Sequence, residues 1–166
     1  RISSLAFDHS GNLWIGTLRG IAKFDGENVQ TFSPATDTAI TAYPCETIAV
    51  DNNGNVWFGS TSDYYQQGGI YKYDGAVWTG YRMDNSSIPD YMIRDIKVDS
   101  QNNLWIATDN YGILKFDGST FEIFNQNSSG ISDIRIKKIA IDQSDNIWTS
   151  AEKYLMNGGI SKYNGS

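Results

Sequence analysis

Tyrosines offer the most readily recognised chemistry in this sequence, because six of the ten lie outside the stretches that recur along the chain. A tyrosine presents an apolar ring face together with a hydroxyl, which suits a polar, ring-shaped ligand such as a sugar. Arginine and aspartate side chains nearby could anchor the polar groups of that ligand. The predicted ligand-binding residues are Tyr43, Tyr64, Tyr65, Tyr91, Arg94, Asp109, Tyr111, Arg135 and Tyr154. The alternative for each tyrosine is that it packs only against its own loop.

Acidic residues in the same irregular stretches support a second hypothesis, since two carboxylates that flank a glycosidic bond can cleave it. The candidates are Asp63, Asp90, Asp109 and Glu152. The only histidine, His9, lies in a turn and is interpreted as solvated, because a general base must sit at the substrate. The sequence has no nucleophile or phosphate-binding motif and no metal-spaced histidine pair. We therefore predict no catalytic residue, no cofactor and no metal.

Charge and composition exclude several classes of partner. The net charge is -6 and no block of Lys or Arg occurs, which argues against nucleic acid, because that binding depends on neutralising phosphates. No apolar run approaches the roughly 18 residues that a membrane-spanning helix needs, so we expect no membrane span in this chain. Cys45 is the only cysteine, which rules out an internal disulfide and a zinc site built on cysteines.

A short tryptophan motif divides the chain into four repeats. The stretch 12–17, Asn-Leu-Trp-Ile-Gly-Thr, returns at 55–60, 103–108 and 146–151. Each copy has an Asp six residues before its Trp and is followed by Gly-Ile, then by Lys, an aromatic residue and Asp-Gly or Asn-Gly. The spacings between tryptophans are 43, 48 and 43 residues, which is typical of units that bury their apolar faces only by stacking on their neighbours.

Each repeat reads as four short strands, and no stretch reads as an amphipathic helix. A tight turn after the first strand has Gly11, Gly54, Asn102 or Asp145 at its fourth position, all residue types that tolerate a left-handed backbone. Evenly spaced four-stranded units with an aromatic mark predict an all-β fold, a β-propeller of four blades. We expect one domain or fragment over 1–166, with blades at about 1–33, 46–82, 94–125 and 137–166 and no outer strand in the last.

The repeated residues resemble the two-component regulator propeller repeat, and the likeness extends over all four copies. The resemblance rests on the run Asp-x-x-Gly-Asn-Leu-Trp-Ile-Gly-Thr, then Gly-Ile and Phe-Asp-Gly. It implies a periplasmic or extracellular sensor propeller of a hybrid two-component histidine kinase, or a related secreted protein, with carbohydrate sensing as its best-known role. The motif residues are structural in that family. The fourth copy departs from the pattern at Thr149, Ser150 and Asn164.

Loop length separates the two rims of such a propeller. The turns between first and second and between third and fourth strands are short, whereas the other links are long and irregular, so we expect any ligand on the long-link rim. The starts of the first strands could form a polar ring at that rim, with the sequences Ser3-Ser4, Glu46-Thr47, Arg94-Asp95 and Lys137-Lys138. Lys97 is expected to reach into a solvated channel.

Four blades rarely close a ring, so we expect an arc that is completed by the remaining blades of a parent protein or by another copy. The four motif tryptophans should be buried between blades, and Trp57→Ala should destabilise the fold more than Trp78→Ala. The leading function is ligand sensing on this frame. The alternatives are a polysaccharide-acting or lyase-type enzyme and a protein-docking platform.

Overall fold

The computed structural model describes residues 1–61, 67–125, 131, 134–151 and 159–164, and every regular element in these ranges is a strand. The strands form four antiparallel sheets, each in chain order. The first sheet contains β1 (Ile2–Phe7), β2 (Leu13–Thr17), β3 (Gly20–Phe24) and β4 (Val29–Phe32). The second contains β5 (Cys45–Val50), β6 (Val56–Ser60), β7 (Gly69–Tyr73) and β8 (Trp78–Tyr81). The third contains β9 (Ile93–Val98), β10 (Leu104–Thr108), β11 (Ile113–Phe116) and β12 (Phe121–Phe124). The fourth contains β13 (Ile136–Ile141), β14 (Ile147–Ala151) and β15 (Ile160–Tyr163).

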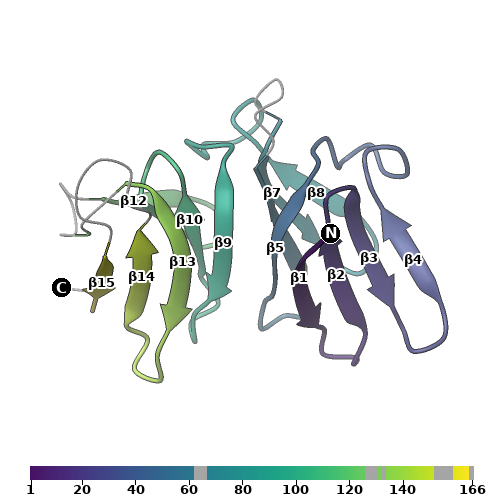
Figure 1. Ribbon diagram of the computed structural model, residues 1–166, viewed down its shortest axis with the longest axis horizontal. Coiled ribbons are helices and arrows are strands. Elements are labelled where there is room, and N and C mark those ends of the chain that lie inside the picture. Colours follow the sequence, from purple (N-terminus) through teal and green to yellow (C-terminus); the bar gives the residue numbers. More distant parts are fainter. Residues whose placement is uncertain (62–66, 126–130, 132–133, 152–158, 165–166) are drawn as a thin grey trace.

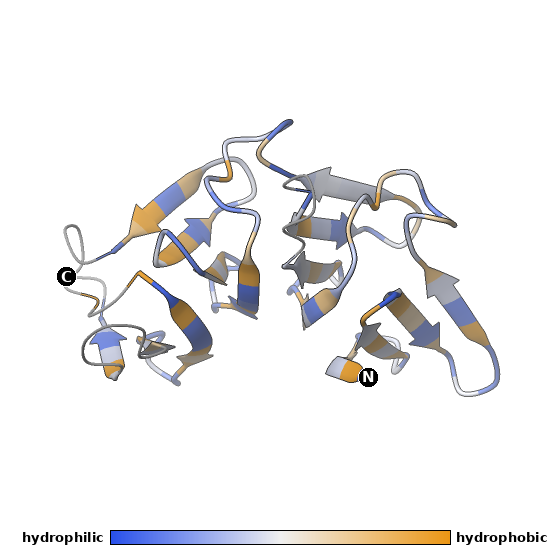
Figure 2. Cartoon of the chain, turned by 45° about the horizontal axis from the view of Figure 1, so that its top comes forward, coloured by the Kyte–Doolittle hydropathy of each residue, from blue (hydrophilic) through white to orange (hydrophobic). Residues whose placement is uncertain are grey.

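These sheets are the blades of a β-propeller, which confirms the predicted fold class. The first strand of each blade contacts the first strand of the next, whereas β4 and β12 lie at the outside of the molecule (Figure 1). The blades follow one another in a curved row (Figure 2). Three described blades have four strands and the last has three. In the described ranges no helix is long and apolar enough to cross a membrane.

One aspartate per blade fixes the turn between its first two strands. In the second blade, Asp51 accepts hydrogen bonds from the backbone N–H and side-chain amide of Asn55 and, at 2.9 Å, from the indole N–H of Trp57. The same contacts recur at Asp8, Asp99 and Asp142. The fourth turn residue has a positive φ in every blade, at Gly11, Gly54, Asn102 and Asp145, as the sequence predicted. The motif aspartate therefore connects a surface turn, through hydrogen bonds, to the tryptophan of the second strand.

The motif tryptophans of the first three blades are the centres of the interfaces between blades. Trp14 packs on Phe32 of its own outer strand and on Tyr73 of the next blade, with ring centroids 5.7 and 5.6 Å away. Trp57 packs in the same way on Tyr81 and Phe116, and Trp105 on Phe124 and Tyr163. Aliphatic side chains of the next blade's first strand complete each cluster. The three interfaces are copies of one arrangement.

Two expectations about tryptophans need correction. Trp148 is 38% exposed, although the other motif tryptophans are buried, because no blade covers its face among the described residues. Trp78 lies on the outermost strand β8, yet it is buried among Trp14, Phe32 and Phe58. The smaller loss expected for Trp78→Ala was inferred from strand position alone. Its burial instead predicts a loss similar to that of Trp57→Ala.

Candidate functional site

The two rims of the arc are built differently. The short turns lie at the bottom of Figure 1 and the long links at its top. Each turn between first and second strands repeats the aspartate contacts given above, so this rim is nearly the same in every blade. The long-link rim has contacts that belong to single blades, and in the third blade they draw three segments together.

Asp90 is the first of these contacts. Its side chain is buried and accepts hydrogen bonds from the backbone N–H groups of Met92, at 3.1 Å, and Asn110, at 2.9 Å. The side-chain amide of Asn110 donates to both carboxylate oxygens at 3.2 Å. One carboxylate therefore joins the link before β9 to the loop between β10 and β11. These hydrogen bonds all come from groups of the two loops, so Asp90 acts as a brace between them.

Arg94 and Asp109 form a second brace, which joins the start of β9 to the loop between β10 and β11. The guanidinium Nε lies 2.8 Å from Asp109 Oδ1 and an amino nitrogen lies 2.5 Å from Oδ2, which is a bidentate ion pair. The side chain of Asp109 is largely buried, whereas about a third of the Arg94 side chain is exposed. The structure brings these two predicted anchors together. The carboxylate is directed at the arginine, which leaves Arg94 as the member that reaches the surface.

A third segment joins through the backbone around Tyr111. Gly112 donates its N–H to the carbonyl of Ile134 at 2.7 Å, and Thr108 Oγ1 accepts from the Tyr111 N–H at 3.1 Å. Tyr111 itself is 40% exposed. Tyr91 and Arg135, which lie in the joined segments, are partly exposed. Tyr91, Arg94, Tyr111 and Arg135 thus belong to one braced part of the rim, and we refer to it as the third-blade rim.

The remaining predicted residues are distributed more widely. Tyr43 is partly exposed in the link before β5, where a cis peptide bond joins it to Pro44. Tyr71 was not predicted, but its buried hydroxyl donates to the carbonyl of Gln67 at 2.8 Å and lies 2.9 Å from Thr41 Oγ1, which secures two links of the second blade. Tyr64, Tyr65 and Tyr154, and the carboxylates Asp63 and Glu152, lie outside the described residues.

Three of the eight residues in the predicted polar ring at the starts of the first strands have a different role. Ser4 accepts a hydrogen bond from Ile48 N–H, Thr47 from Ile96 N–H and Asp95 from Ile139 N–H, at 3.0, 3.4 and 3.1 Å. Each side chain therefore joins its blade to the next. Lys97 lies 3.4 Å from Asp95, so its ammonium forms an ion pair there. The sequence did not predict these hydrogen bonds between blades, because they form only when two repeats lie side by side.

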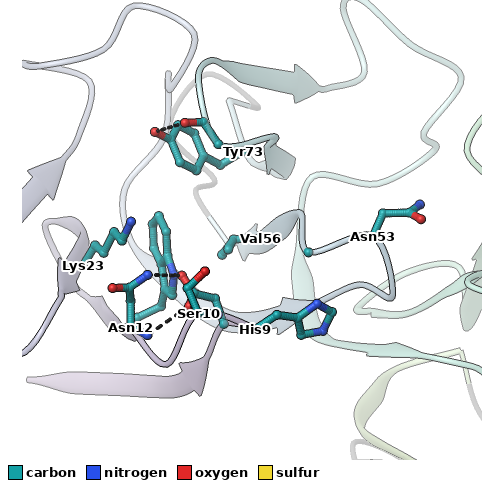
Figure 3. A pocket seen from close by; sticks show the side chains of 11 residues that line it. His9, Ser10, Asn12, Lys23, Asn53, Val56 and Tyr73 are labelled. Atoms are coloured by element: carbon teal, nitrogen blue, oxygen red, sulfur yellow. Dashed lines mark hydrogen bonds between the residues drawn. The ribbon is translucent and has the colours of Figure 1, made fainter.

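A cleft occurs on the opposite, short-turn rim between the first two blades (Figure 3). It has a volume of about 340 Å³, and its lining includes His9, Ser10, Asn12, Lys23 and Tyr73. Burial raises the pKa of Asp8 at its base, but hydrogen bonds from Asn12 and Trp14 outweigh this effect and hold that pKa below its ordinary value. The ammonium of Lys23 lies 5.7 Å from the centroid of the Trp14 ring.

A second cleft of about 310 Å³ lies between the third and fourth blades, where Lys115, Trp105 and Tyr163 take the equivalent positions. Motif residues at equivalent positions contribute to the lining of both clefts. His9 lines the first cleft, and from the sequence we interpreted it as a solvated turn residue. In the described part of the chain, no group of three or more His, Cys, Asp or Glu side chains could hold a metal ion.

Comparisons with known proteins agree with this architecture. Residues 1–19 and 87–110 match the family model described as two component regulator propeller. A search of curated proteins gives no match. Among solved structures, the chain is similar to one named as the extracellular domain of a hybrid two component system, BT3049 from B. thetaiotaomicron. The identity is 20% and the TM-score 0.53, over 99% of this chain and 27% of that one.

Two enzymes have similar folds. The first is the catalytically inactive H270A virginiamycin B lyase from Staphylococcus aureus, with 13% identity and a TM-score of 0.70 over 97% of this chain and 54% of that one. The second is the GH74 enzyme of Niastella koreensis, with 16% identity and a TM-score of 0.67 over 97% of this chain and 28% of that one. The chain thus spans between about a quarter and about half of these proteins. At these identities the likeness establishes the fold.

Proposed function

We propose that this chain, which carries repeats of the two-component regulator propeller type, is a ligand-sensing domain of a two-component regulatory system and that its ligand is a carbohydrate. The observation that carries the proposal is the third-blade rim. Three segments that are distant in sequence are joined there by the buried Asp90, by the Arg94–Asp109 pair and by the Gly112–Ile134 hydrogen bond. A rigid frame that presents variable loops is a common basis for binding.

The chemistry of the exposed groups on this rim favours a sugar. Tyr111 and Tyr91 provide ring faces for the C–H groups of a pyranose and hydroxyls for its oxygens. Arg94 and Arg135 provide donors for hydroxyl or carboxylate oxygens. Because hydrogen bonds and an ion pair within the protein join these loops, binding would cost little ordering of the protein, which supports affinity in a small site.

An extracytoplasmic location, periplasmic or extracellular, is part of the proposal. It is supported by the similarity to a domain named as the extracellular part of a hybrid two component system. A sensor in that position would meet oligosaccharides released outside the cell.

Titration of a panel of oligosaccharides by calorimetry tests the proposal. With a sugar that binds, Tyr111→Ala and Tyr65→Ala should each weaken affinity by about 1 kcal/mol or more, on the usual scale for anchors in a small site. His9→Ala is the matched control, because His9 lies on the opposite rim. If no sugar binds, or if His9→Ala abolishes binding and the tyrosine variants do not, the proposal is wrong.

Arg94→Ala would change stability as well as binding. Removal of the guanidinium would leave the largely buried Asp109 without its ion-pair partner. A lower melting temperature is therefore expected together with weaker binding.

The enzyme alternative is tested in the same samples. Asp90 and Asp109, the described members of the predicted carboxylate set, are buried and hydrogen-bonded to protein groups. We therefore expect the oligosaccharides to be recovered intact after long incubation. Cleavage products seen by chromatography, and lost in Asp63→Asn or Glu152→Gln, would favour the enzyme.

A further inference from the structure

The first strands of the four blades differ in charge. β1 contains no charged residue and β5 contains a single one. β9 and β13 together contain five, namely Arg94, Asp95, Lys97, Lys137 and Lys138. These two strands contact each other and lie side by side (Figure 1). Four of their five charged residues are cations, although the whole chain has a net charge of -6.

Asp95 is shared by two of these cations. Its side chain is buried, and the Nζ atom of Lys97 lies 3.4 Å from Oδ1. The Nζ atom of Lys138 reaches back from the fourth blade to 4.0 Å from the same oxygen. The carboxylate also accepts hydrogen bonds from the Thr47 hydroxyl and the Ile139 N–H, at 3.0 and 3.1 Å. One negative charge thus faces two positive charges, and we call Asp95, Lys97 and Lys138 the inner cluster.

The propeller scaffold does not require either lysine. Lys97 pairs across the hairpin with the motif tryptophan of its blade, and the residues at this position in the other blades are Ala6, Ala49 and Ala140. The position of Lys138 is held in the other blades by Ser4, Thr47 and Asp95. The Lys97 side chain is 44% exposed, so its ammonium is accessible to solvent. The two lysines are therefore particular to this pair of blades.

The third-blade rim continues the positive surface. The described carboxylates beside it, Asp90 and Asp109, are buried against donors of the protein, whereas Arg94 and Arg135 are partly exposed. Arg94 directly precedes Asp95 on β9, so the rim and the inner cluster follow one another along a single strand. Among the described residues of this region, the charges that a ligand would meet are positive.

We propose that the ligand is an acidic oligosaccharide, whose carboxylate or sulfate ester binds Lys97 and Lys138 while its sugar rings lie on the third-blade rim. The inference rests on the proposed function, because it names the class of sugar for the same rim. An anion at the inner cluster would balance the positive charge that Asp95 alone leaves uncompensated. Hydrogen bonds between charged groups are stronger than neutral ones, so this contact would discriminate against neutral sugars.

Calorimetric titration with matched pairs of oligosaccharides tests the inference. The acidic members are oligogalacturonates, glucuronate-containing oligosaccharides and sulfated oligosaccharides. The neutral partner of each has its carboxylates reduced to alcohols or its sulfates removed. One acidic member should bind about tenfold or more tightly than its neutral partner, on the scale of a hydrogen bond to a charged group. The uronate and sulfate arms identify which anionic group is bound.

Ionic strength provides an independent measurement on the same pairs. The Debye length falls from about 30 Å at about 0.01 M salt to about 3 Å at about 1 M. Binding of the acidic oligosaccharide should therefore weaken severalfold over this range, whereas that of a neutral partner should change little. Acidic binding that does not respond to salt would overturn the inference, because charge would then contribute nothing to recognition.

Two variants locate the bound anion. Lys97→Ala introduces the residue that the other three blades have, and Lys138→Thr introduces the residue of the second blade, so both should fold, which thermal melts verify. Each should weaken binding of the acidic oligosaccharide about tenfold. Lys97→Arg keeps the charge and should keep most of the affinity. Arg19→Ala is the control, because it removes the same charge from an exposed turn of the first blade and should leave binding unchanged.

The outcomes separate this inference from the proposed function. A neutral oligosaccharide that binds as tightly as its acidic partner would overturn the inference and would still support sugar sensing. Acidic binding that persists in both lysine variants would do the same. Failure of every sugar, acidic or neutral, would overturn both. Acidic binding that is lost in Lys97→Ala and Lys138→Thr but kept in Arg19→Ala is the result that we expect.

Discussion

The short-turn rim and the long-link rim of this propeller use aspartates in opposite ways. On the short-turn rim, Asp8, Asp51, Asp99 and Asp142 make the same contacts with an asparagine and a tryptophan of their own blade. On the long-link rim, Asp90 and Asp109 join segments of different links, and each contact occurs once. The first rim therefore stabilises a repeated unit. The second holds individual loops in place through contacts that belong to single blades.

Removal of a motif tryptophan should have the largest effect. Trp57→Ala should destabilise the chain by about 3 to 5 kcal/mol, because the ring fills an interface between two blades. Trp148→Ala is the matched control, since the same motif residue is partly exposed, and it should cost about 1 kcal/mol. Urea unfolding followed by circular dichroism measures both. Equal losses would mean that the tryptophans stabilise their own hairpins rather than the interfaces.

The second-largest loss of stability is expected on removal of the motif aspartate in the second blade. Asp51→Ala should cost about 2 to 3 kcal/mol, because it leaves the Trp57 indole N–H and the Asn55 groups without an acceptor in a buried place. Sugar binding to the folded variant should be unchanged, since the turn lies on the opposite rim. A variant that melts normally but no longer binds would reverse the roles assigned to the two rims.

Acid should weaken the turns for a related reason. Hydrogen bonds from Trp148 and Asn146 lower the pKa of Asp142, and backbone N–H groups of Asn28 and Glu27 lower that of Asp25 from its ordinary value of 3.8. A carboxylate with a folded pKa below its unfolded pKa stabilises the fold fully above the unfolded value, and this contribution is lost as the pH falls towards the folded value. Thermal melts should therefore be nearly constant from about pH 7 to 5 and fall below about pH 4. Asp142→Asn should reduce the steepness of that fall.

The repeated part of this molecule was predictable from the sequence, and the interfaces were only partly so. The Asp-to-Trp spacing and the residue types at Gly54 and Asn102 predicted the hairpins and their left-handed turns, because those features depend on local backbone chemistry. The exposure of Trp148 was not predicted, since the Asp, Asn and Trp of the motif are the same whether or not a neighbouring blade covers the tryptophan. The burial of Trp78 was missed because strand order says little about how a large ring turns inward.

From the sequence we could propose a rim for the candidate site, but we could not predict which of its side chains contact one another. Loop length indicated the rim, and Arg94 and Asp109 were predicted as separate anchors. Arg94 lies on β9 and Asp109 directly follows β10, so their pairing depends on the register of these two antiparallel strands, which is irregular at this end. The hydrogen bonds that Ser4, Thr47 and Asp95 accept from the next blade were also not predicted, because they are contacts between repeats. Polar residues at the start of a strand look alike whether they face a ligand or the next blade.

The measurement that most directly tests the difference between the rims is amide NMR with a bound oligosaccharide. Titration should shift the backbone signals of Asn110, Tyr111 and Gly112 and leave those of Ser10, Asn53 and Gly54 in place. Shifts confined to the short-turn residues would contradict the account and would assign binding to the cleft beside His9.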